Sequence, residues 1–208
     1  MNREIMVSSQ IEMRGVTNPA VLAAMRKVER NKLVPDDLQP VAYADNPLPI
    51  GHGQTISQPY IVAYMTELLN PDPTKRILEI GTGSGYQAAV LAEIVKDVYT
   101  IEIIPALAER AKVNLEAMGY RNIHFRTGDG GLGWPEEAPF DGIIVTAAAG
   151  VIPEQLMMQL KEDACMVIPL GGASTVQSLS VVVREEDGFK IKETIGVRFV
   201  PLTGVTQQ

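Results

Sequence analysis

The chain is poor in the residues that build covalent crosslinks or metal sites. It contains one cysteine and two histidines among 208 residues. The single cysteine, Cys165, excludes an intramolecular disulfide, and its apolar neighbours predict a buried thiol in a reducing compartment. The histidines, His52 and His124, do not have the spacing of a zinc site, so no metal is expected.

Long apolar runs and basic stripes are missing as well. No segment approaches the ~20 apolar residues that span a bilayer, and the first residues lack the apolar stretch of a signal peptide. Lys plus Arg total 18 against 25 Asp plus Glu, and no basic run offers a surface to a phosphate backbone. These absences predict a cytoplasmic protein that binds neither membranes nor nucleic acid, and nothing calls for an obligate protein partner.

What the chain does have is a regular alternation of apolar strands and amphipathic helices. Strands are expected at 76–80, 98–102, 122–126, 142–146 and 164–170, and helices at 87–95, 105–118 and 153–160. This order predicts an α/β fold, with a doubly wound, mostly parallel sheet covered by helices on both faces. Two later apolar segments, 177–184 and 189–199, flank a polar turn and predict an antiparallel hairpin at the C-terminal edge.

The N-terminal third follows a different pattern. Asn18 and Pro19 begin a helix as N-cap and first helical residue, and a second helix is expected from Pro59 onward. Residues 34–58 between them hold four prolines and two glycines, which predicts a long loop, ordered or disordered. A loop of this length in a compact domain is usually functional or mobile.

We therefore expect one domain over residues 1–208. An N-terminal helical extension and loop occupy 1–70, a cofactor-binding core occupies 71–170, and C-terminal strands occupy 171–208.

The glycine-rich segment Gly81-Thr82-Gly83-Ser84-Gly85 joins the first predicted strand to a helix. Ligands of open α/β sheets bind at such carboxyl ends of strands, and glycine permits a tight turn and a close approach. A dinucleotide site needs its third glycine where Tyr86 stands. Glu79 would also repel a pyrophosphate, whereas it suits the ammonium and sulfonium of S-adenosylmethionine. The turn therefore predicts S-adenosylmethionine rather than NAD.

Two more acids follow the next two strands. Glu102 is placed to accept both ribose hydroxyl protons, and Asp129 to accept from the adenine amino group. Taken singly, each carboxylate fits a solvated loop as well. Three acids at the ends of successive strands are a stronger indication of a nucleoside site.

Five motifs resemble the protein-L-isoaspartate O-methyltransferases. They are Pro47–Tyr60 (PLPIGHGQTISQPY), Leu78–Gln87 (LEIGTGSGYQ), Gly128-Asp129-Gly130 with Gly133-Trp134 nearby, Pro139-Phe140-Asp141 leading to Val145–Ala148 (VTAA), and Val197–Leu202 (VRFVPL). The resemblance covers nearly the whole chain, and the tail after Thr203 matches least. It implies transfer of a methyl group from S-adenosylmethionine to the free α-carboxylate of L-isoaspartyl residues in damaged proteins and peptides. The ester then closes to a succinimide, and hydrolysis returns some normal aspartate.

That reaction makes modest chemical demands. An α-carboxylate with a pKa of ~3.5 is already ionised at neutral pH, so no general base is required. Alignment of the reacting atoms can supply up to ~7–11 kcal/mol of barrier reduction. The lack of a Ser-His-Asp or Cys-His arrangement is therefore expected, and His52 is assigned a positional or incidental role.

The resemblance marks Ser57 as the catalytic position, as a hydroxyl donor to the substrate carboxylate and not a nucleophile. Thr55 is the second candidate donor. From the residues alone, Ser57 could instead cap the helix that begins at Pro59. The backbone of Gln54 to Ser57 is placed to touch both cofactor and substrate.

The resemblance also suggests that Val197–Leu202 is an edge strand whose backbone pairs with the substrate peptide. The alternative is an ordinary edge strand, blunted by Pro201. The expected substrate contacts are Thr55, Ser57, Val197, Phe199, Val200, Pro201 and Leu202. The expected cofactor contacts are Gln54, Thr55, Ile56, Ser57, Glu79, Gly81, Gly83, Gly85, Glu102, Ile103, Asp129 and Gly130.

Three alternatives remain at this level. They are a methyltransferase for another carboxylate, an NAD-dependent oxidoreductase, and a non-catalytic module that keeps the cofactor pocket. The sequence gives no indication of oligomeric state or of substrate sequence preference.

Overall fold

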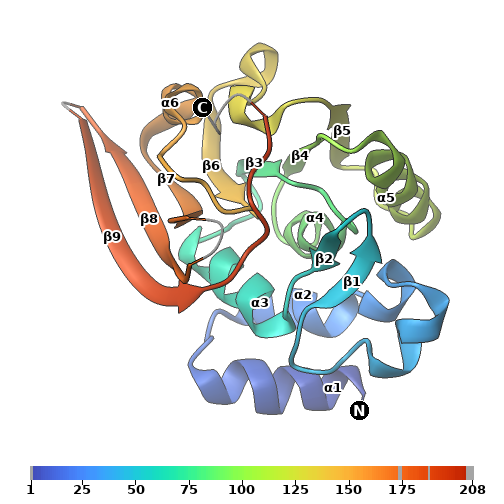
Figure 1. Ribbon diagram of the computed structural model, residues 1–208. Helices are drawn as coiled ribbons and strands as arrows, with labels where there is room; N and C mark the ends of the chain where they lie inside the picture. The colour runs from blue at the N-terminus through green and yellow to red at the C-terminus, as the bar shows by residue number, and fades with distance from the viewer. Residues whose placement is uncertain (1, 173–174, 187, 205–208) are drawn as a thin grey trace.

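A computed structural model describes residues 2–172, 175–186 and 188–204, and its centre is a seven-stranded sheet (Figure 1). The strand order is β5-β4-β3-β6-β7-β8-β9. The strands from β5 to β7 are parallel, and β8 and β9 are antiparallel. The α/β prediction with an antiparallel C-terminal edge is confirmed. The strands are β3 (Arg76–Ile80), β4 (Asp97–Glu102), β5 (Ile123–Thr127), β6 (Phe140–Val145), β7 (Leu160–Leu170), β8 (Gln177–Glu185) and β9 (Gly188–Val197).

Helices cover both faces of this sheet. The helices α2, α3, α4 and α5 contribute to one core cluster, together with strand residues such as Ile77 and Val98. The helix α6 contributes to a second cluster, which contains the next residues of those strands, Leu78 and Tyr99. Adjacent strand residues thus enter opposite cores, which is why the strands are apolar throughout. The helices are α2 (Pro19–Lys27), α3 (Pro59–Leu68), α4 (Tyr86–Ala92), α5 (Pro105–Ala117) and α6 (Glu154–Met158).

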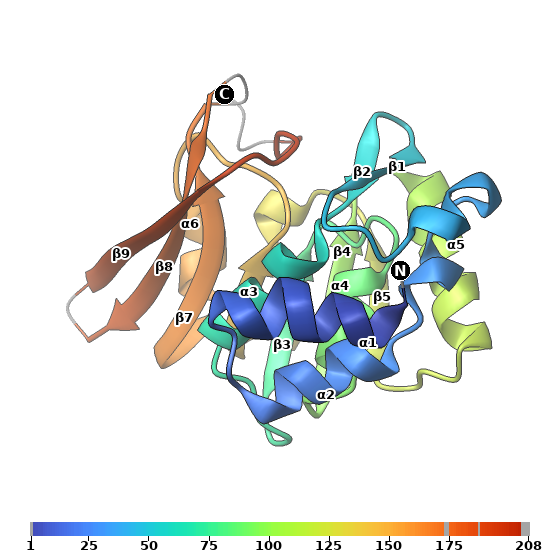
Figure 2. The same ribbon diagram turned by 90° about the horizontal axis from the view of Figure 1, so that it is seen from below.

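The first residues form a helical run that the sequence patterns did not predict. It consists of α1 (Arg3–Ile5), the π-helical η1 (Met6–Ile11) and the 3-10 turn η2 (Glu12–Arg14). Figure 2 shows this run beside α2. Met6, Val7 and Ile11 are fully buried there, so the N-terminal extension is part of the core.

Residues 34–58, expected to form a loop, contain the 3-10 helix η4 (Asp36–Val41) and a two-stranded hairpin. Its strands are β1 (Leu48–Gly51) and β2 (Gln54–Ile56), which pair antiparallel. The prediction of a loop was therefore incomplete, because the prolines and glycines break the segment into short regular pieces. The remaining short helices are η3 (Arg30–Leu33), η5 (Gly130–Leu132) and η6 (Pro135–Glu137).

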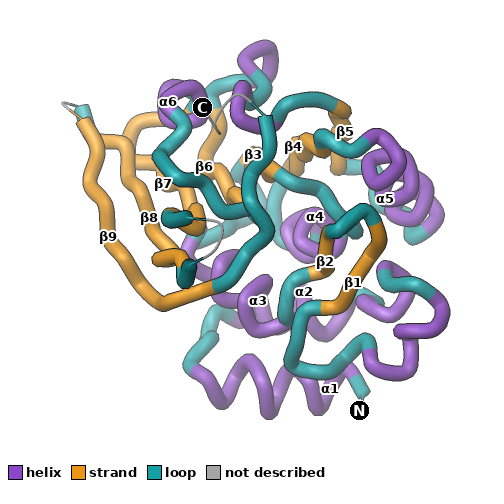
Figure 3. The backbone as a smooth tube through the Cα atoms, in the orientation of Figure 1, coloured by secondary structure: helices purple, strands orange, loops and turns teal. Residues whose placement is uncertain are grey.

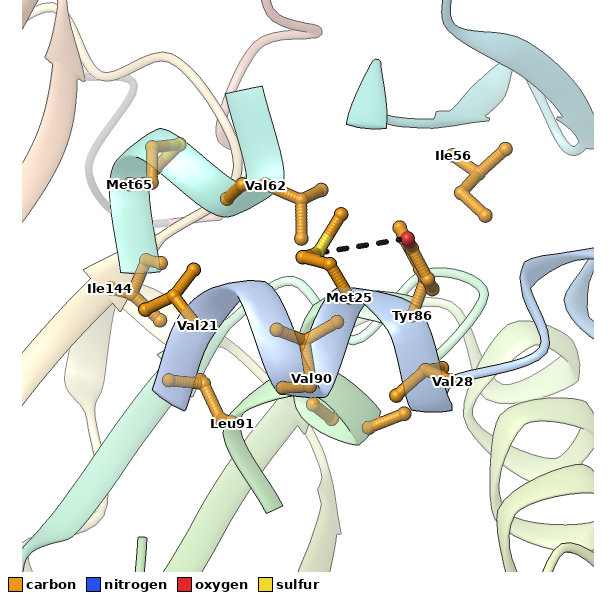
Figure 4. Packing of buried hydrophobic residues seen from close by; sticks show 14 of the residues in the cluster. Val21, Met25, Val28, Ile56, Val62, Met65, Tyr86, Val90, Leu91 and Ile144 are labelled. Atoms are coloured by element: carbon orange, nitrogen blue, oxygen red, sulfur yellow. Dashed lines mark hydrogen bonds between the residues drawn. The ribbon is translucent and has the colours of Figure 1, made fainter. Parts of the chain in front are cut away.

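Figure 4 shows how the helix after the glycine-rich turn packs in the larger core. Tyr86, the first residue of α4, is 1% exposed and its hydroxyl group lies 3.8 Å from Met25 Sδ of α2. Val62 and Met65 of α3 pack in the same cluster. The helix that follows the glycine-rich turn is therefore fixed against the N-terminal extension.

The end of the last predicted strand is wrong. The strand β9 ends at Val197, two residues before the predicted end at Phe199, and the following chain leaves the edge of the sheet. The reason is that Phe199 donates its N–H group to the buried side chain of Gln177 at 2.9 Å. Figure 3 shows this coil running back toward the middle of the sheet, where Pro201 forms an isolated bridge with Ala148.

Two more predicted boundaries shift. The strand β7 begins four residues earlier than expected, where Leu160 pairs with Phe140 of β6. The helix α6 is shorter than the predicted 153–160, because Pro153 is its N-cap and the chain enters β7 directly after it. Within the ranges given above, the structure has no helix with the length and apolar character that a bilayer crossing requires.

Candidate active site

A pocket lies at the carboxyl ends of β3, β4 and β6. Its walls are the glycine-rich turn, the strand β2 with Ser57, and the coil after β9. The structure brings most of the predicted cofactor residues together there: Gln54, Thr55, Ile56, Ser57, Gly81, Gly83, Glu102, Ile103 and Gly130. Glu79, Gly85 and Asp129 lie outside this lining.

The conformation of the glycine-rich turn follows from its contacts with the protein. Gly81 and Gly85 have φ angles of 97° and 85°, a region that residues with a Cβ atom rarely adopt. A Cβ atom at Gly81 would lie 2.5 Å from Thr146 Oγ1, and one at Gly85 would lie 2.7 Å from Leu115 Cδ1. These two glycines are therefore required by packing against Thr146, the residue after β6, and against α5, as well as by the turn itself.

Glu102 joins the turn to the loop that follows β4. Its side-chain oxygens accept hydrogen bonds from the N–H groups of Gly83 at 2.8 Å and Ile104 at 3.0 Å. A carboxylate has about four lone-pair sites, so each oxygen can accept a further bond from the pocket. Glu102 is thus preorganised as an acceptor at the predicted ribose position.

Glu79 is fully buried beneath the turn and reaches the pocket only through two hydroxyl groups. Thr100 donates to Glu79 Oε2, and the Thr82 and Thr100 hydroxyl oxygens are 2.6 Å apart. Because the Thr100 proton points at Glu79, Thr82 donates to Thr100 and keeps its lone pairs for the pocket that it lines. Glu79 Oε1 is buried without a hydrogen-bond partner among the described residues. Burial raises the pKa of Glu79 to about 8.

Asp129 precedes the pocket residue Gly130 as the N-cap of η5. It accepts a hydrogen bond from the N–H group of Gly131 at 2.9 Å. Gly204, from the coil after β9, approaches so closely that a Cβ atom there would collide with the Asp129 carboxyl group. The C-terminal coil therefore lies directly over the predicted adenine position.

Ser57 lines the pocket together with Thr55 and does not cap α3. The N-cap of α3 is Gln58, and no side chain in the described residues caps this end. The capping alternative for Ser57 is therefore wrong. Its hydroxyl group has no hydrogen-bond partner among the described residues and is available for a ligand. The backbone carbonyl of Ser57 accepts a hydrogen bond from Arg30 at 3.0 Å.

Only part of the predicted substrate segment reaches the pocket. Val200, Pro201 and Leu202 line it, whereas Val197 and Phe199 do not. The segment is held on one side by Ala148, which donates to Val200 at 2.8 Å and accepts from Leu202 at 2.7 Å.

Three further residues belong to the site although the sequence analysis did not include them among the site residues. Thr82 and Thr146 line the pocket, and Arg30 lies behind it. Thr82 was detectable, because it stands inside the glycine-rich motif. Arg30 carries no local sequence pattern.

The histidines take no part in the pocket lining. His52 has a φ angle of 55° in the exposed turn between β1 and β2. His124 lies 3.1 Å from Asp97 and stacks on Tyr99. In residues 2–172, 175–186 and 188–204, no group of three or more His, Cys, Asp or Glu residues could hold a metal ion. Cys165 is half-buried, and burial raises the pKa of its thiol.

Comparisons with known proteins agree with this architecture. The family model for protein-L-isoaspartate(D-aspartate) O-methyltransferase matches residues 1–207. A protein-L-isoaspartate O-methyltransferase of Picosynechococcus is 54% identical over 97% of this chain and 90% of its own length. One of Opitutus terrae is 54% identical over 97% of this chain and 86% of its own length.

Solved structures give the same result. A protein-L-isoaspartate O-methyltransferase superposes with a TM-score of 0.89 at 29% identity, covering 99% of this chain and 67% of that one. A candidate enzyme of the same kind from Plasmodium falciparum, in complex with S-adenosyl-L-homocysteine, has a TM-score of 0.84 at 25% identity. That match covers 98% of this chain and 99% of the other.

Proposed function

The chain belongs to the protein-L-isoaspartate(D-aspartate) O-methyltransferase family, and we propose here how its pocket performs the reaction of that family. The protein is a repair enzyme that uses S-adenosylmethionine to methylate L-isoaspartyl residues of proteins. Transfer of the methyl group to the α-carboxylate leaves S-adenosylhomocysteine. A neighbouring backbone amide nitrogen then displaces methanol from the ester to close a succinimide, and hydrolysis of the ring returns some aspartate.

The residues at the carboxyl ends of the strands fit S-adenosylmethionine. When bound, this group supplies a methyl carbon that its sulfonium activates. The donors and acceptors match its chemistry, because Glu102 offers carboxylate oxygens to hydroxyl groups and the exposed side chain of Ile103 offers an apolar surface. Gly81, Gly83 and Gly130 line the pocket without side chains of their own, so a ligand can approach their backbone closely.

Glu79 acts on the ammonium group through Thr100 and Thr82 in this proposal, and not by direct contact. Its buried carboxyl group keeps Thr100 and Thr82 oriented, so that Thr82 presents acceptor lone pairs to the pocket. Gly85 contributes by allowing the turn, and Asp129 accepts the adenine amino group from behind Gly130.

Ser57 donates its hydroxyl proton to one oxygen of the substrate α-carboxylate and so turns the other oxygen toward the methyl carbon. The observation that carries this proposal is that the Ser57 hydroxyl group, unused by α3, lines the same pocket as the glycine-rich turn. Thr55 provides a second donor from β2. No residue needs to accept a proton, because the carboxylate is already ionised at neutral pH.

The coil at Val200, Pro201 and Leu202 forms the opposite wall for the substrate peptide. Its backbone is paired with Ala148 on one side, which supports a role for the other side in pairing with an extended peptide. Val197 and Phe199 support this wall from behind: Val197 is buried, and the Phe199 N–H group is bound by Gln177.

The predicted segments 1–70, 71–170 and 171–208 all contribute side chains or backbone to this one pocket. That shared pocket supports the proposal that the whole chain acts as a single catalytic domain.

The proposal is tested with a pair of peptides that differ only in isoaspartyl or aspartyl linkage. We expect methylation of the isoaspartyl peptide alone, whereas equal methylation of both would indicate an enzyme for carboxylates in general. Calorimetric titration with S-adenosylhomocysteine and with NAD is the second arm. Tight binding of NAD alone would exclude the methyltransferase, and binding of S-adenosylhomocysteine without turnover would indicate a non-catalytic module.

The role of Ser57 is tested in the same assay with Ser57→Ala. We expect kcat to fall about 30-fold, because the lost donor oriented the carboxylate. The dissociation constant of S-adenosylhomocysteine should stay within about threefold of wild type, since only transition-state alignment is lost. A collapse of that affinity would assign Ser57 to cofactor binding instead.

A further inference from the structure

Arg30 is a fully buried arginine, 0% exposed, at the beginning of η3. None of the ion pairs among the described residues includes it. A buried guanidinium without a carboxylate is costly unless other groups replace its hydration. Its partners therefore indicate why the residue is there.

Those partners are three backbone carbonyl groups of the segment that leads to the active site. Arg30 Nη1 donates to the carbonyl oxygen of Ala42, and Nη2 donates to those of Asn46 at 3.3 Å and Ser57 at 3.0 Å. Ala42 and Asn46 precede the β1–β2 hairpin, and Ser57 follows it. One side chain therefore closes the base of the hairpin that carries Thr55.

The guanidinium also lies near the first residue of α4. Arg30 Cζ lies 5.6 Å from the ring centroid of Tyr86, a cation–π arrangement. Tyr86 lines the pocket and is the first residue after the glycine-rich turn. Burial lowers the pKa of Arg30 to about 10, so the group keeps its charge at neutral pH. The guanidinium thus lies between the Ser57 backbone and the helix that begins at the turn.

We propose that Arg30 is a positioning residue for methyl transfer, which holds the Ser57 backbone so that its hydroxyl group faces the substrate carboxylate. The inference rests on the proposed role of Ser57. Arginine suits this task because its planar fork reaches several acceptors at once, whereas the ammonium group of lysine is a single point.

The first experiment measures kcat, KM and S-adenosylhomocysteine affinity for Arg30→Met and Arg30→Lys. Because Arg30 acts through Ser57, its loss cannot exceed that of Ser57→Ala, and we expect kcat to fall about tenfold in Arg30→Met. In Arg30→Lys the lysine restores part of the contact, so kcat should fall only about threefold. Unchanged kcat in both variants would overturn the inference.

The matched control is Arg14→Met. Arg14 also binds this part of the chain, through a salt bridge of 3.0 Å to Asp45, but it is exposed and does not contact Ser57. We expect kcat within about twofold of wild type for this variant. A loss as large as that of Arg30→Met would show that any weakening of the segment lowers activity, which overturns a specific role for Arg30.

A double variant separates positioning from a general structural effect. With the hydroxyl group already removed, Arg30→Met combined with Ser57→Ala should have the kcat of Ser57→Ala within about twofold. Multiplied losses would show that Arg30 acts independently of Ser57, and the inference would be wrong. If Arg30→Met does not fold, as judged by thermal melting and by binding of S-adenosylhomocysteine, the same cycle is run with Arg30→Lys.

The two proposals fail in different ways. Full activity of Ser57→Ala would remove the proposed role of Ser57 and the inference on Arg30 with it. A loss in Ser57→Ala together with wild-type kcat in both Arg30 variants would leave the proposed function intact and overturn only the inference.

Discussion

The pocket has a cofactor wall, formed by Gly81 to Gly85, and a substrate wall, formed by β2 and Ser57. Different contacts hold these two walls in place. The first is packed directly, with Gly81 against Thr146 and Gly85 against Leu115. The second is held by hydrogen bonds from distant arginines to backbone carbonyl groups. Arg30 binds that of Ser57 at 3.0 Å, and Arg110 binds that of Ile50 at 2.5 Å.

This difference predicts unequal tolerance to substitution. Close packing leaves no room for an added atom, so a small change in the cofactor wall should have a large effect. Hydrogen bonds to carbonyl groups can be lost one at a time, and the remaining bonds still hold the segment. Changes in the substrate wall should therefore lower activity by degrees.

The largest effect is expected for Gly81→Ala. The added Cβ atom would lie 2.5 Å from Thr146 Oγ1, at a φ angle of 97°. The turn must shift to relieve this contact, and we expect affinity for S-adenosylhomocysteine to fall at least about 100-fold, measured by calorimetry. Gly150→Ala is the control, because a Cβ atom at Gly150 meets no atom within 4 Å. Near-normal affinity in Gly81→Ala would contradict the idea of a tightly packed wall.

The same difference explains how far the sequence alone could predict the molecule. The strands β3 to β7 and the glycine-rich turn are local patterns, set by apolar runs and by the need for positive φ angles. The predicted site residues at this wall therefore lie mostly in the pocket. Glu79 is an exception, because it is fully buried beneath the turn, where Thr100 donates a hydrogen bond to it.

The substrate wall carries weaker local patterns. Ser57 before Pro59 has the sequence of a helix cap, and only the resemblance to a family marked it as catalytic. Arg30 was not found, because carbonyl groups are present at every residue and leave no sequence signature. The end of β9 depends on Gln177, which lies 22 residues before Phe199 in the chain. Such long-range contacts become visible only in the fold.

Glu79→Gln examines the buried acid behind the cofactor wall. The pKa of Glu79 is raised by burial to about 8, above its ordinary value of 4.5. The folded protein therefore binds a proton that the unfolded chain has released, and this contribution to stability is lost as pH rises toward 8. We expect the free energy of unfolding of the wild type to fall by about 1.4 kcal/mol between about pH 6 and pH 7 from this group.

In Glu79→Gln, the free energy of unfolding should not show this fall between about pH 6 and pH 7. It is measured by urea unfolding of the ligand-free enzyme. Glu136→Gln is the control, because the pKa of exposed Glu136 is lowered by its own backbone N–H group and by Arg126. The Glu136 carboxyl group therefore releases its proton below pH 6. Glu136→Gln should keep the fall in the free energy of unfolding that the wild type shows between about pH 6 and pH 7. If the free energy of unfolding depends on pH in the same way in the wild type and in Glu79→Gln, Glu79 is ionised in the folded protein.

Thr82→Val tests the proposed hydroxyl path from Glu79 to the pocket. Valine keeps the shape and the burial of Thr82 but removes the group that donates to Thr100 and faces the ligand. Loss of one hydrogen bond to a charged group should weaken S-adenosylhomocysteine binding about fivefold to tenfold. Thr175→Val, which removes a hydroxyl bound at 3.0 Å to a backbone carbonyl away from the pocket, should bind normally. Unchanged affinity in Thr82→Val would mean that the ammonium group does not depend on this path.

The smallest effect is expected for Arg110→Met, in the substrate wall. Arg110 of α5 donates to the carbonyl of Ile50 in β1, so its loss frees the hairpin near its turn while Arg30 still closes the base. We expect KM for the isoaspartyl peptide to rise about threefold with kcat nearly unchanged, because the hairpin becomes more mobile but Ser57 stays aligned.

The control for this last change is Arg121→Met. Arg121 also donates to backbone carbonyl groups, those of Glu116 and Tyr120, but it contacts neither β1 nor β2. Its KM should match the wild type. A drop in kcat for Arg110→Met as large as that for Arg30→Met would mean that the whole hairpin aligns Ser57. The substrate wall would then tolerate substitutions as poorly as the cofactor wall, and the contrast between the two walls would disappear.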